Sequence, residues 1–171
     1  MRIFRLFYMK MLQIINPIKY VDYCGVKHGD RLHLYGKVSF GSEPWIIKLG
    51  DNVHLTNDIK FITHDGGTLL FRKEVPDLEA TKPITIGNNV YIGVNVIILP
   101  GVSIGDNVIV GAGSIVTRSL ASGGVYAGNP ARYIKSIEDY FKKIQGESLH
   151  LGDLSPSEKD LALRKYYGES N

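Results

Sequence analysis

Aliphatic side chains recur at every sixth position through the middle of this chain, a period that an α-helix does not produce. One series comprises Ile86, Ile92, Ile98, Ile104, Val110 and Val116, and a second, two positions earlier, comprises Ile84, Val90, Val96, Val102 and Val108, with Ser114 in its last place. Residues spaced i and i+2 lie on the same face of a short strand. The pattern therefore predicts one short strand in each hexapeptide, with both aliphatic side chains facing a common core.

Corner-forming residues occupy much of the remaining sequence. Gly, Asn and Asp follow the strands, as in Gly87-Asn88-Asn89 and Gly105-Asp106-Asn107. These residue types tolerate the left-handed backbone conformation that a sharp corner needs. A strand and a corner every six residues give a coil with flat sides, in which three hexapeptides close one triangular turn. Because each coil buries its aliphatic side chains only against the next coil, the expected core is a column.

The repeat extends further toward the N-terminus, with one interruption. The same spacing of aliphatic residues is found at Ile47, Val53 and Ile59. The register slips between Phe40 and Ile47, and the pattern is absent from His64 to Pro83. We therefore expect coils over residues 30–63 and 84–118, with an extruded loop between them. Long insertions into a regular scaffold are frequently functional.

The sequence predicts three segments. An N-terminal helical or irregular segment covers residues 1–29, the coiled domain covers 30–135 with its loop at 64–83, and a C-terminal helical segment covers 136–171. A first C-terminal helix is expected over 136–145. The pattern Ser155-Pro-Ser-Glu158 is typical of a capping box with proline at the first helical position, which predicts a second helix ending near Tyr167.

The first twenty residues are apolar and basic. Arg5 and Lys10 interrupt the apolar stretch, so it cannot span a bilayer as it stands. No small-residue cleavage site follows it, as a secretory signal would require. Two interpretations stay open. The segment is a helix that docks on the body of the protein or on a neighbouring subunit, or it is a helix that lies on an anionic membrane surface.

Composition narrows the class of protein. The 171 residues are 44% hydrophobic and 22% charged, which is typical of one globular domain with a substantial core. The net charge of +3 is too small to indicate nucleic-acid binding. Cys24 is the single cysteine, so no internal disulfide can form, which fits a reducing compartment. We expect a cytoplasmic protein, with the inner face of the membrane as an alternative location.

Several motifs resemble those of a known family. The run from Ile84 to Arg118 resembles the hexapeptide-repeat acyltransferases, and Ala127-Gly-Asn-Pro-Ala-Arg132 is similar to the terminal motif of that family. More narrowly, Gly41-Ser-Glu-Pro-Trp45 and Phe61-Ile-Thr-His-Asp-Gly-Gly67 look like segments of enzymes that acetylate the sugars of capsular or other surface polysaccharides. Maltose and galactoside O-acetyltransferases are related to these. The resemblance covers about residues 30–135 and implies a mainly β fold, a left-handed parallel β-helix with C-terminal α-helices.

The resemblance also implies an activity. Members of the family transfer an acetyl group from acetyl-CoA, without a metal, and form homotrimers with active sites between neighbouring columns. The implied acceptor is a sugar hydroxyl, in a precursor of a surface polysaccharide. His64 matches the histidine that deprotonates the acceptor, a role suited to an imidazole, which as a class titrates near neutral pH. The backbone N–H of Val94 matches the group that stabilises the oxyanion, although the family often has a smaller residue there.

Further candidates come from the resemblance, except Asn57, which is a candidate because it lies at a corner one edge before His64. Glu43 is a candidate to orient His64 or to hold the sugar, and Asn57 is a candidate to bind acceptor hydroxyls; the alternatives are a solvated corner carboxylate and a residue that shapes a turn. The positions that match the coenzyme A groove are Ala112, Thr117, Arg118, Arg132 and Lys135. Arginine and lysine suit phosphate groups. The alternative for these last residues is a set of solvated charges on the exposed face of the last coil.

Four other functions are weighed against sugar O-acetylation. An amino-sugar N-acetyltransferase or a serine acetyltransferase shares the same coil. A γ-type carbonic anhydrase requires three histidines around zinc, and beyond His54 and His64 the coils offer no clear third. A non-catalytic binding protein would not explain the extruded loop that begins at His64.

Overall fold

The computed structural model describes residues 2–169. Met1 and residues 170–171, at the ends of the predicted terminal segments, lie outside the described residues. The chain forms two compact units, Met1–Ile137 and Glu138–Asn171. Within the described residues, no helix combines the length and the apolar character needed to cross a membrane.

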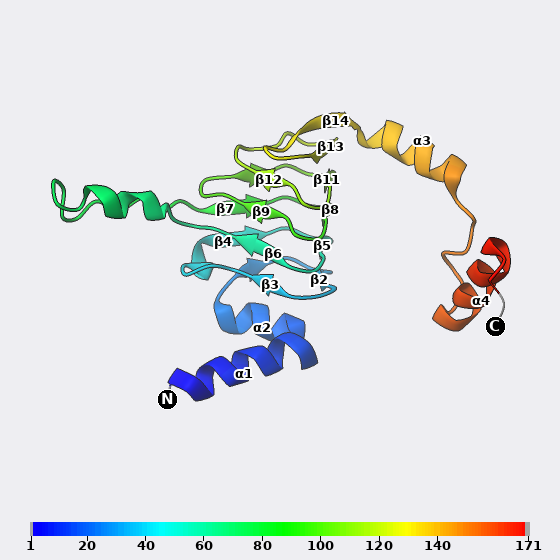
Figure 1. Ribbon diagram of the computed structural model, residues 1–171, viewed down its shortest axis with the longest axis horizontal. Helices are drawn as coiled ribbons and strands as arrows, with labels where there is room; N and C mark the ends of the chain where they lie inside the picture. The colour runs from blue at the N-terminus through cyan, green and yellow to red at the C-terminus, as the bar shows by residue number, and fades with distance from the viewer. Residues whose placement is uncertain (1, 170–171) are drawn as a thin grey trace. The chain divides into compact units, whose positions relative to one another are not determined.

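Short strands of the first unit stack into three sheets that form the sides of a column (Figure 1). Sheet A contains β1 (Lys27–His28), β4 (Ile47–Leu49), β7 (Ile84–Ile86) and β10 (Ser103–Ile104). Sheet B contains β2 (His33–Leu34), β5 (Val53–Leu55), β8 (Val90–Ile92), β11 (Val108–Val110), β13 (Gly124–Ala127) and β14 (Arg132–Ser136). Sheet C contains β3 (Val38–Ser39), β6 (Ile59–Phe61), β9 (Ile97–Ile98) and β12 (Ile115–Val116). From β1 to β12 the chain visits A, B and C in turn, and equivalent strands of successive coils pair in parallel.

The period of six produces a buried column. Every position of the two predicted aliphatic series is buried, at 2% exposure or less. In β7, for example, Ile84 and Ile86 face the core and Thr85 faces outward. The one polar member of the series, Ser114, donates a hydrogen bond from its hydroxyl to the carbonyl oxygen of Gly111 at 2.6 Å, so its burial leaves no unpaired hydroxyl.

The turns between sheets A and B, which we call the A–B corner, carry a ladder of side-chain hydrogen bonds. Oδ1 of Asp51 accepts from the backbone N–H of Asp30 at 2.8 Å, and Oδ1 of Asn88 accepts from that of Asp51 at 2.8 Å. Oδ1 of Asp106 accepts from Asn88 at 2.6 Å. The left-handed conformation occurs at Asn52, Asn89 and Asn107. The prediction that Asn and Asp form the corners is therefore confirmed.

The coils are not equal in length, and the differences fall at one place. Residues in register are 18 apart between β7 and β10, but 21 apart between β1 and β4, and 37 apart between β4 and β7. In both long coils the extra residues lie between a sheet C strand and the sheet A strand that follows. We call the turns on this edge the C–A corner. The two departures from the repeat are therefore stacked one above the other.

Helices α1 (Arg2–Ile15) and α2 (Pro17–Cys24) lie at the N-terminal end of the column (Figure 1). Leu12 of α1 and Tyr20 and Val21 of α2 belong to the same buried cluster as the coils. Asn16 caps α2, because its side chain accepts a hydrogen bond from the backbone N–H of Lys19. The N-terminal segment thus docks on the body of the protein, as one of the two interpretations expects.

At the other end, the coil continues past the readable repeat. β13 pairs in parallel with β11, and β14 pairs antiparallel with β13. The remainder of the chain contains α3 (Ile137–Glu147) and α4 (Pro156–Tyr167), in agreement with the two predicted helices. Both hydrogen bonds of the predicted capping box between Ser155 and Glu158 are present.

Candidate active site

The shorter insertion at the C–A corner presents Glu43. In place of a tight turn between β3 and β4, the chain forms the 3₁₀ helix η1 (Pro44–Ile46). Glu43 immediately precedes this helix, and Pro44 occupies its first position, where a missing N–H leaves no hydrogen bond unmade. The slip of register seen in the sequence between Phe40 and Ile47 is therefore the turn that carries this carboxylate.

The longer insertion places His64 at the base of a projecting loop. His64 forms an antiparallel bridge with Thr81, and the backbone N–H of Asp65 donates to the carbonyl oxygen of Ala80 at 2.9 Å. These contacts close the neck of the loop. Beyond the neck the chain forms the 3₁₀ helix η2 (Gly66–Phe71), which projects away from the column in Figure 1. His64 is thus held by the column rather than by the tip of the loop.

Stacking of the two insertions brings Glu43 and His64 together through Thr63. Oε2 of Glu43 accepts a hydrogen bond from Oγ1 of Thr63 at 2.5 Å and lies 3.1 Å from Nδ1 of His64. Thr63 is fully buried, whereas 25% of the Glu43 side chain and 44% of the His64 side chain are exposed. The imidazole is therefore fixed from its inner side and open to solvent on the other.

Electrostatics favour one arrangement of the protons. The Thr63 hydroxyl, opposed by partial desolvation and assisted by His64, holds the pKa of Glu43 below its ordinary value of 4.5. Glu43 is therefore a carboxylate at neutral pH, and a carboxylate beside Nδ1 accepts a hydrogen bond from it. This assignment leaves Nε2 of His64 as the ring nitrogen with a free lone pair.

Two hollows meet at His64. One, of about 420 Å³, runs along the C–A corner past Leu99 and Pro100 to Thr117, and so connects His64 with one of the predicted coenzyme A residues. The other, of about 240 Å³, lies on the loop side, and its polar lining includes Glu43, Arg72 and Glu79. His64 lines both the column-side hollow and the loop-side hollow, together with Asp65, Gly66 and Ala80.

Asn57 is not brought to His64. It lies in the turn between β5 and β6, on the edge between sheets B and C that we call the B–C corner. Its Oδ1 accepts from the backbone N–H of Lys37 at 2.8 Å, and its Nδ2 donates to Asp58 at 2.8 Å. The amide therefore shapes the turn, as the alternative interpretation of this residue expects.

Two of the coenzyme A candidates share that corner. Val94 and Ala112 occupy the B–C turns of the next two coils, and the carbonyl oxygen of Val94 accepts a hydrogen bond from Gly113 at 2.7 Å. Both side chains are exposed. Within one chain, the predicted site residues thus divide between two edges of the column, with sheet C between them.

The predicted phosphate-binding cations lie close to the end of the column. Arg118 follows Thr117 at the C–A corner, and Arg132 and Lys135 belong to β14. Among the residues that the structure describes, none of the three cations forms an ion pair with a carboxylate, and Arg118 and Arg132 are exposed. These side chains are available to an anionic ligand.

Sequence reasoning missed Thr63, Arg72 and Glu79. Thr63 had a readable signal, because it stands two residues after Phe61 on the inward face, where the column otherwise places aliphatic side chains. A buried hydroxyl in an apolar column needs a partner, and Glu43 supplies it. Arg72 and Glu79 lie in the loop, which has no repeat from which to read the direction of a side chain.

The histidines of sheet B do not extend this site. His33 and His54 stack with ring centroids 4.5 Å apart, and the hydroxyl of Tyr35 lies 2.8 Å from Nδ1 of His54. Within residues 2–169, no three His, Cys, Asp or Glu side chains gather in a group suited to a metal ion.

Comparison with known proteins decides the family. Residues 83–118 match the family described as hexapeptide repeat of succinyl-transferase. Protein CapG of Staphylococcus aureus is 48% identical to this chain over 132 residues, which cover 77% of each protein. The chain belongs to the hexapeptide-repeat acyltransferases. The prediction of an acyltransferase is confirmed.

Other members of the acyltransferase family extend the comparison. The galactoside O-acetyltransferase of Escherichia coli (strain K12) is 55% identical over 71 residues, which cover 39% of this chain and 35% of that protein. A solved galactoside acetyltransferase in complex with coenzyme A matches with a TM-score of 0.60 at 29% identity, covering 78% of this chain and 79% of the other. The predicted left-handed parallel β-helix is thereby confirmed.

Proposed function

We propose that this acyltransferase moves an acetyl group from acetyl-CoA to a hydroxyl of a sugar, with His64 as the general base. The observation that carries the proposal is the position of His64, which lies where two hollows adjoin and is oriented by Glu43. An imidazole with one hollow on each side is within reach of two bound molecules. The galactoside acetyltransferase that shares this fold holds coenzyme A.

The proposed reaction needs one proton carrier. Acetyl-CoA supplies a thioester as the acyl donor. Nε2 of His64 takes the proton of the acceptor hydroxyl as the oxygen forms its bond to the acyl carbon, and the imidazolium then returns the proton to the thiolate that leaves when the carbon–sulfur bond breaks. Glu43, through Nδ1, orients the ring and stabilises its positive charge. We assign the backbone N–H of Val94 to the oxyanion.

The loop-side hollow is the proposed acceptor site. Its polar side chains, Glu43, Arg72 and Glu79, offer both donors and acceptors of hydrogen bonds, which suits a polyhydroxylated ligand. A sugar of a surface-polysaccharide precursor remains our proposed acceptor, from the motifs around Glu43 and His64. The cytoplasm is the proposed compartment, since the one cysteine of the chain fits a reducing environment.

We further propose that the working enzyme is a homotrimer. The candidate residues divide between the C–A corner, with His64 and Thr117, and the B–C corner, with Val94 and Ala112. A ring of three columns would set the C–A corner of one copy against the B–C corner of the next, and a cyclic arrangement of this kind closes without free ends. The site would then be complete only between subunits.

The test combines kinetics with subunit mixing. The variant His64→Ala is expected to keep its fold and lose roughly 100-fold to 10,000-fold in kcat, the range that general base catalysis supplies. The variant Ala112→Asp is expected to be inactive because a carboxylate stands in the coenzyme A groove. Mixed oligomers of the two inactive chains should regain activity, since some interfaces are intact on both sides. Wild-type turnover by His64→Ala would remove the mechanism, and mixed oligomers without activity would remove the shared site. Light scattering gives the oligomeric state directly.

A further inference from the structure

One face of α1 is apolar and uncovered in the described part of the chain. The other face holds the helix on the column, because Leu12 is buried and Nε2 of Gln13 donates to the carbonyl oxygen of Val38 at 2.7 Å. The exposed face has apolar side chains at spacings of three and four, namely Phe4 (81% exposed), Phe7 (71%), Met11 (37%), Ile14 (82%) and Ile15 (73%). A helix of a soluble domain normally turns such a stripe inward. In α1 this apolar stripe faces outward instead.

The described charge of α1 is positive. Lys10 is the charged side chain of this helix that the structure describes, and it is exposed, whereas the first carboxylate of the chain, Asp22, belongs to α2. That carboxylate lies 3.1 Å from Nε2 of His28. An apolar helix face bordered by positive charge is complementary to an anionic lipid surface. A symmetric contact with a second copy would instead bring like charges face to face.

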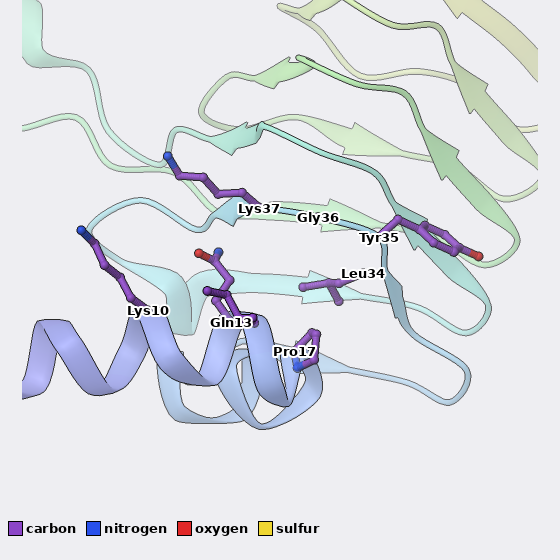
Figure 2. Close-up of a pocket in the computed structure, with 8 residues that line it drawn as sticks. Lys10, Gln13, Pro17, Leu34, Tyr35, Gly36 and Lys37 are labelled. Atoms are coloured by element: carbon purple, nitrogen blue, oxygen red, sulfur yellow. The ribbon is translucent and has the colours of Figure 1, made fainter.

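The hollow beside the helix extends this surface. It has a volume of about 540 Å³ and lies between α1 and the first coil. Figure 2 shows Lys10, from α1, and Lys37, from the turn after β2, extending toward the same side of the hollow. Ile14 lines the same hollow. Two ammonium groups next to an apolar face provide a place for the phosphate of a lipid headgroup.

Aromatic side chains add a second element. Tyr8 of α1 and Tyr23 of α2 contact each other edge to face, with ring centroids 5.5 Å apart, and each is 43% exposed. Tyrosine has an apolar ring with a polar tip, which suits the boundary between headgroups and acyl chains. At 14 residues, α1 is too short to span a bilayer, so the geometry that remains is a helix parallel to the surface.

We propose that α1 binds the surface of an anionic phospholipid bilayer, with Phe4, Phe7 and Ile14 inserted among the lipids and Lys10 and Lys37 at the headgroups. This surface is separate from the residues proposed for acetyl transfer, so the two proposals stand or fall independently.

The experiment is sedimentation of the full-length protein with phosphatidylcholine vesicles that contain or lack phosphatidylglycerol. The protein should sediment with the anionic vesicles and not with the neutral ones. Binding should weaken as salt rises from about 0.1 M to about 1 M, which shortens the Debye length from about 10 Å to about 3 Å. Equal binding to both kinds of vesicle, or binding to neither, would overturn the proposal.

A matched pair of variants tests the surface itself. Phe7→Ser with Ile14→Ser removes two exposed apolar side chains from α1, and should lower the partition coefficient by at least about tenfold. Phe141→Ser with Ile144→Ser removes the same residue types from α3, where they are 64% and 43% exposed, and should leave binding unchanged. All four side chains lie outside the buried core. Equal loss in both variants would contradict the proposal, and so would a wild-type oligomer that dissociates on the α1 substitutions, because a second copy would then cover this face.

Discussion

The hydroxyl of Thr63 is predicted to matter for catalysis although it touches neither proposed hollow. Thr63→Val replaces the hydroxyl with a methyl group of similar size, in a side chain that is fully buried. The substitution removes the 2.5 Å hydrogen bond to Oε2 of Glu43, and with it the group that fixes the carboxylate beside Nδ1 of His64. The expected consequence is a less well oriented imidazole, with the column unchanged.

The size of the effect follows from the kind of hydrogen bond. A hydrogen bond to a charged group contributes about 1.5–3 kcal/mol. If that free energy is lost from the orientation of His64, kcat falls between about 10-fold and about 100-fold, at about 1.4 kcal/mol for each factor of ten. This is smaller than the loss expected for His64→Ala, because the base itself remains. The KM for acetyl-CoA should change little, since Thr63 does not line the hollow that leads to Thr117.

A titration of the carboxyl group separates positioning from simple destabilisation. The Thr63 hydroxyl is the main cause of the lowered pKa of Glu43, so its removal raises that pKa toward 4.5. The pKa of Glu43, followed by NMR of its carboxyl carbon, should therefore be higher in Thr63→Val than in the wild type. Thr63→Ser keeps the hydroxyl and should keep both the rate and this pKa. Wild-type kcat with an unmoved pKa of Glu43 in Thr63→Val would refute the reasoning.

Three further predictions concern the groove, the column and pH. Arg132→Ala should raise the KM for acetyl-CoA more than it lowers kcat, in steady-state kinetics, because the guanidinium is assigned to a phosphate; the reverse pattern would contradict that role. Gly93→Ala places a Cβ 2.6 Å from the backbone nitrogen of Ala112 in the next coil, and should lower the free energy of unfolding in urea by about 1–3 kcal/mol. Gly66→Ala, whose added Cβ has no atom within 4 Å, should not lower it; equal effects would show that the close spacing of the coils is not the cause. Burial, with a contribution from His33, lowers the pKa of His54 from 6.5, so the free energy of unfolding should decrease as pH falls below about 6.5. His54→Gln should make the free energy of unfolding less dependent on pH in this range, and an unchanged dependence would contradict the prediction.

The column was predictable because its physics is local. Each inward position needs an aliphatic side chain and each corner a residue that tolerates a left-handed turn, and both demands repeat every six residues. The first coil begins at β1, before the readable repeat. The sequence did not reveal this strand, because Lys27 faces outward and the inward-facing residues around it are too few to show a period. The antiparallel strand β14 was likewise unreadable, since nothing in its sequence specifies an edge against β13.

The candidate site was predictable only in part. The break in the repeat marked His64, and the slip of register marked the segment that holds Glu43. Their proximity required knowing that both insertions occur at the same corner, which becomes clear only when successive coils are counted in register. Asn57 was a candidate because of its corner position one edge before His64, and the structure shows its amide engaged with Lys37 and Asp58. The catalytic role of His64 stays a prediction until the variants are measured.

Because the neck of the loop is closed by contacts next to His64, the sequence of the loop can change during evolution without a change in the column. β4 and β7 pair in full register although their paired residues are 37 apart in the sequence. The pairing of these strands therefore does not depend on the length or sequence of the loop between them. A homologue could carry a different loop after His64, with another length and other lining residues, without a substitution at any buried position of the column. Diversification toward new acceptors is therefore expected to proceed by replacing this loop, while His64, the proposed base, stays in place.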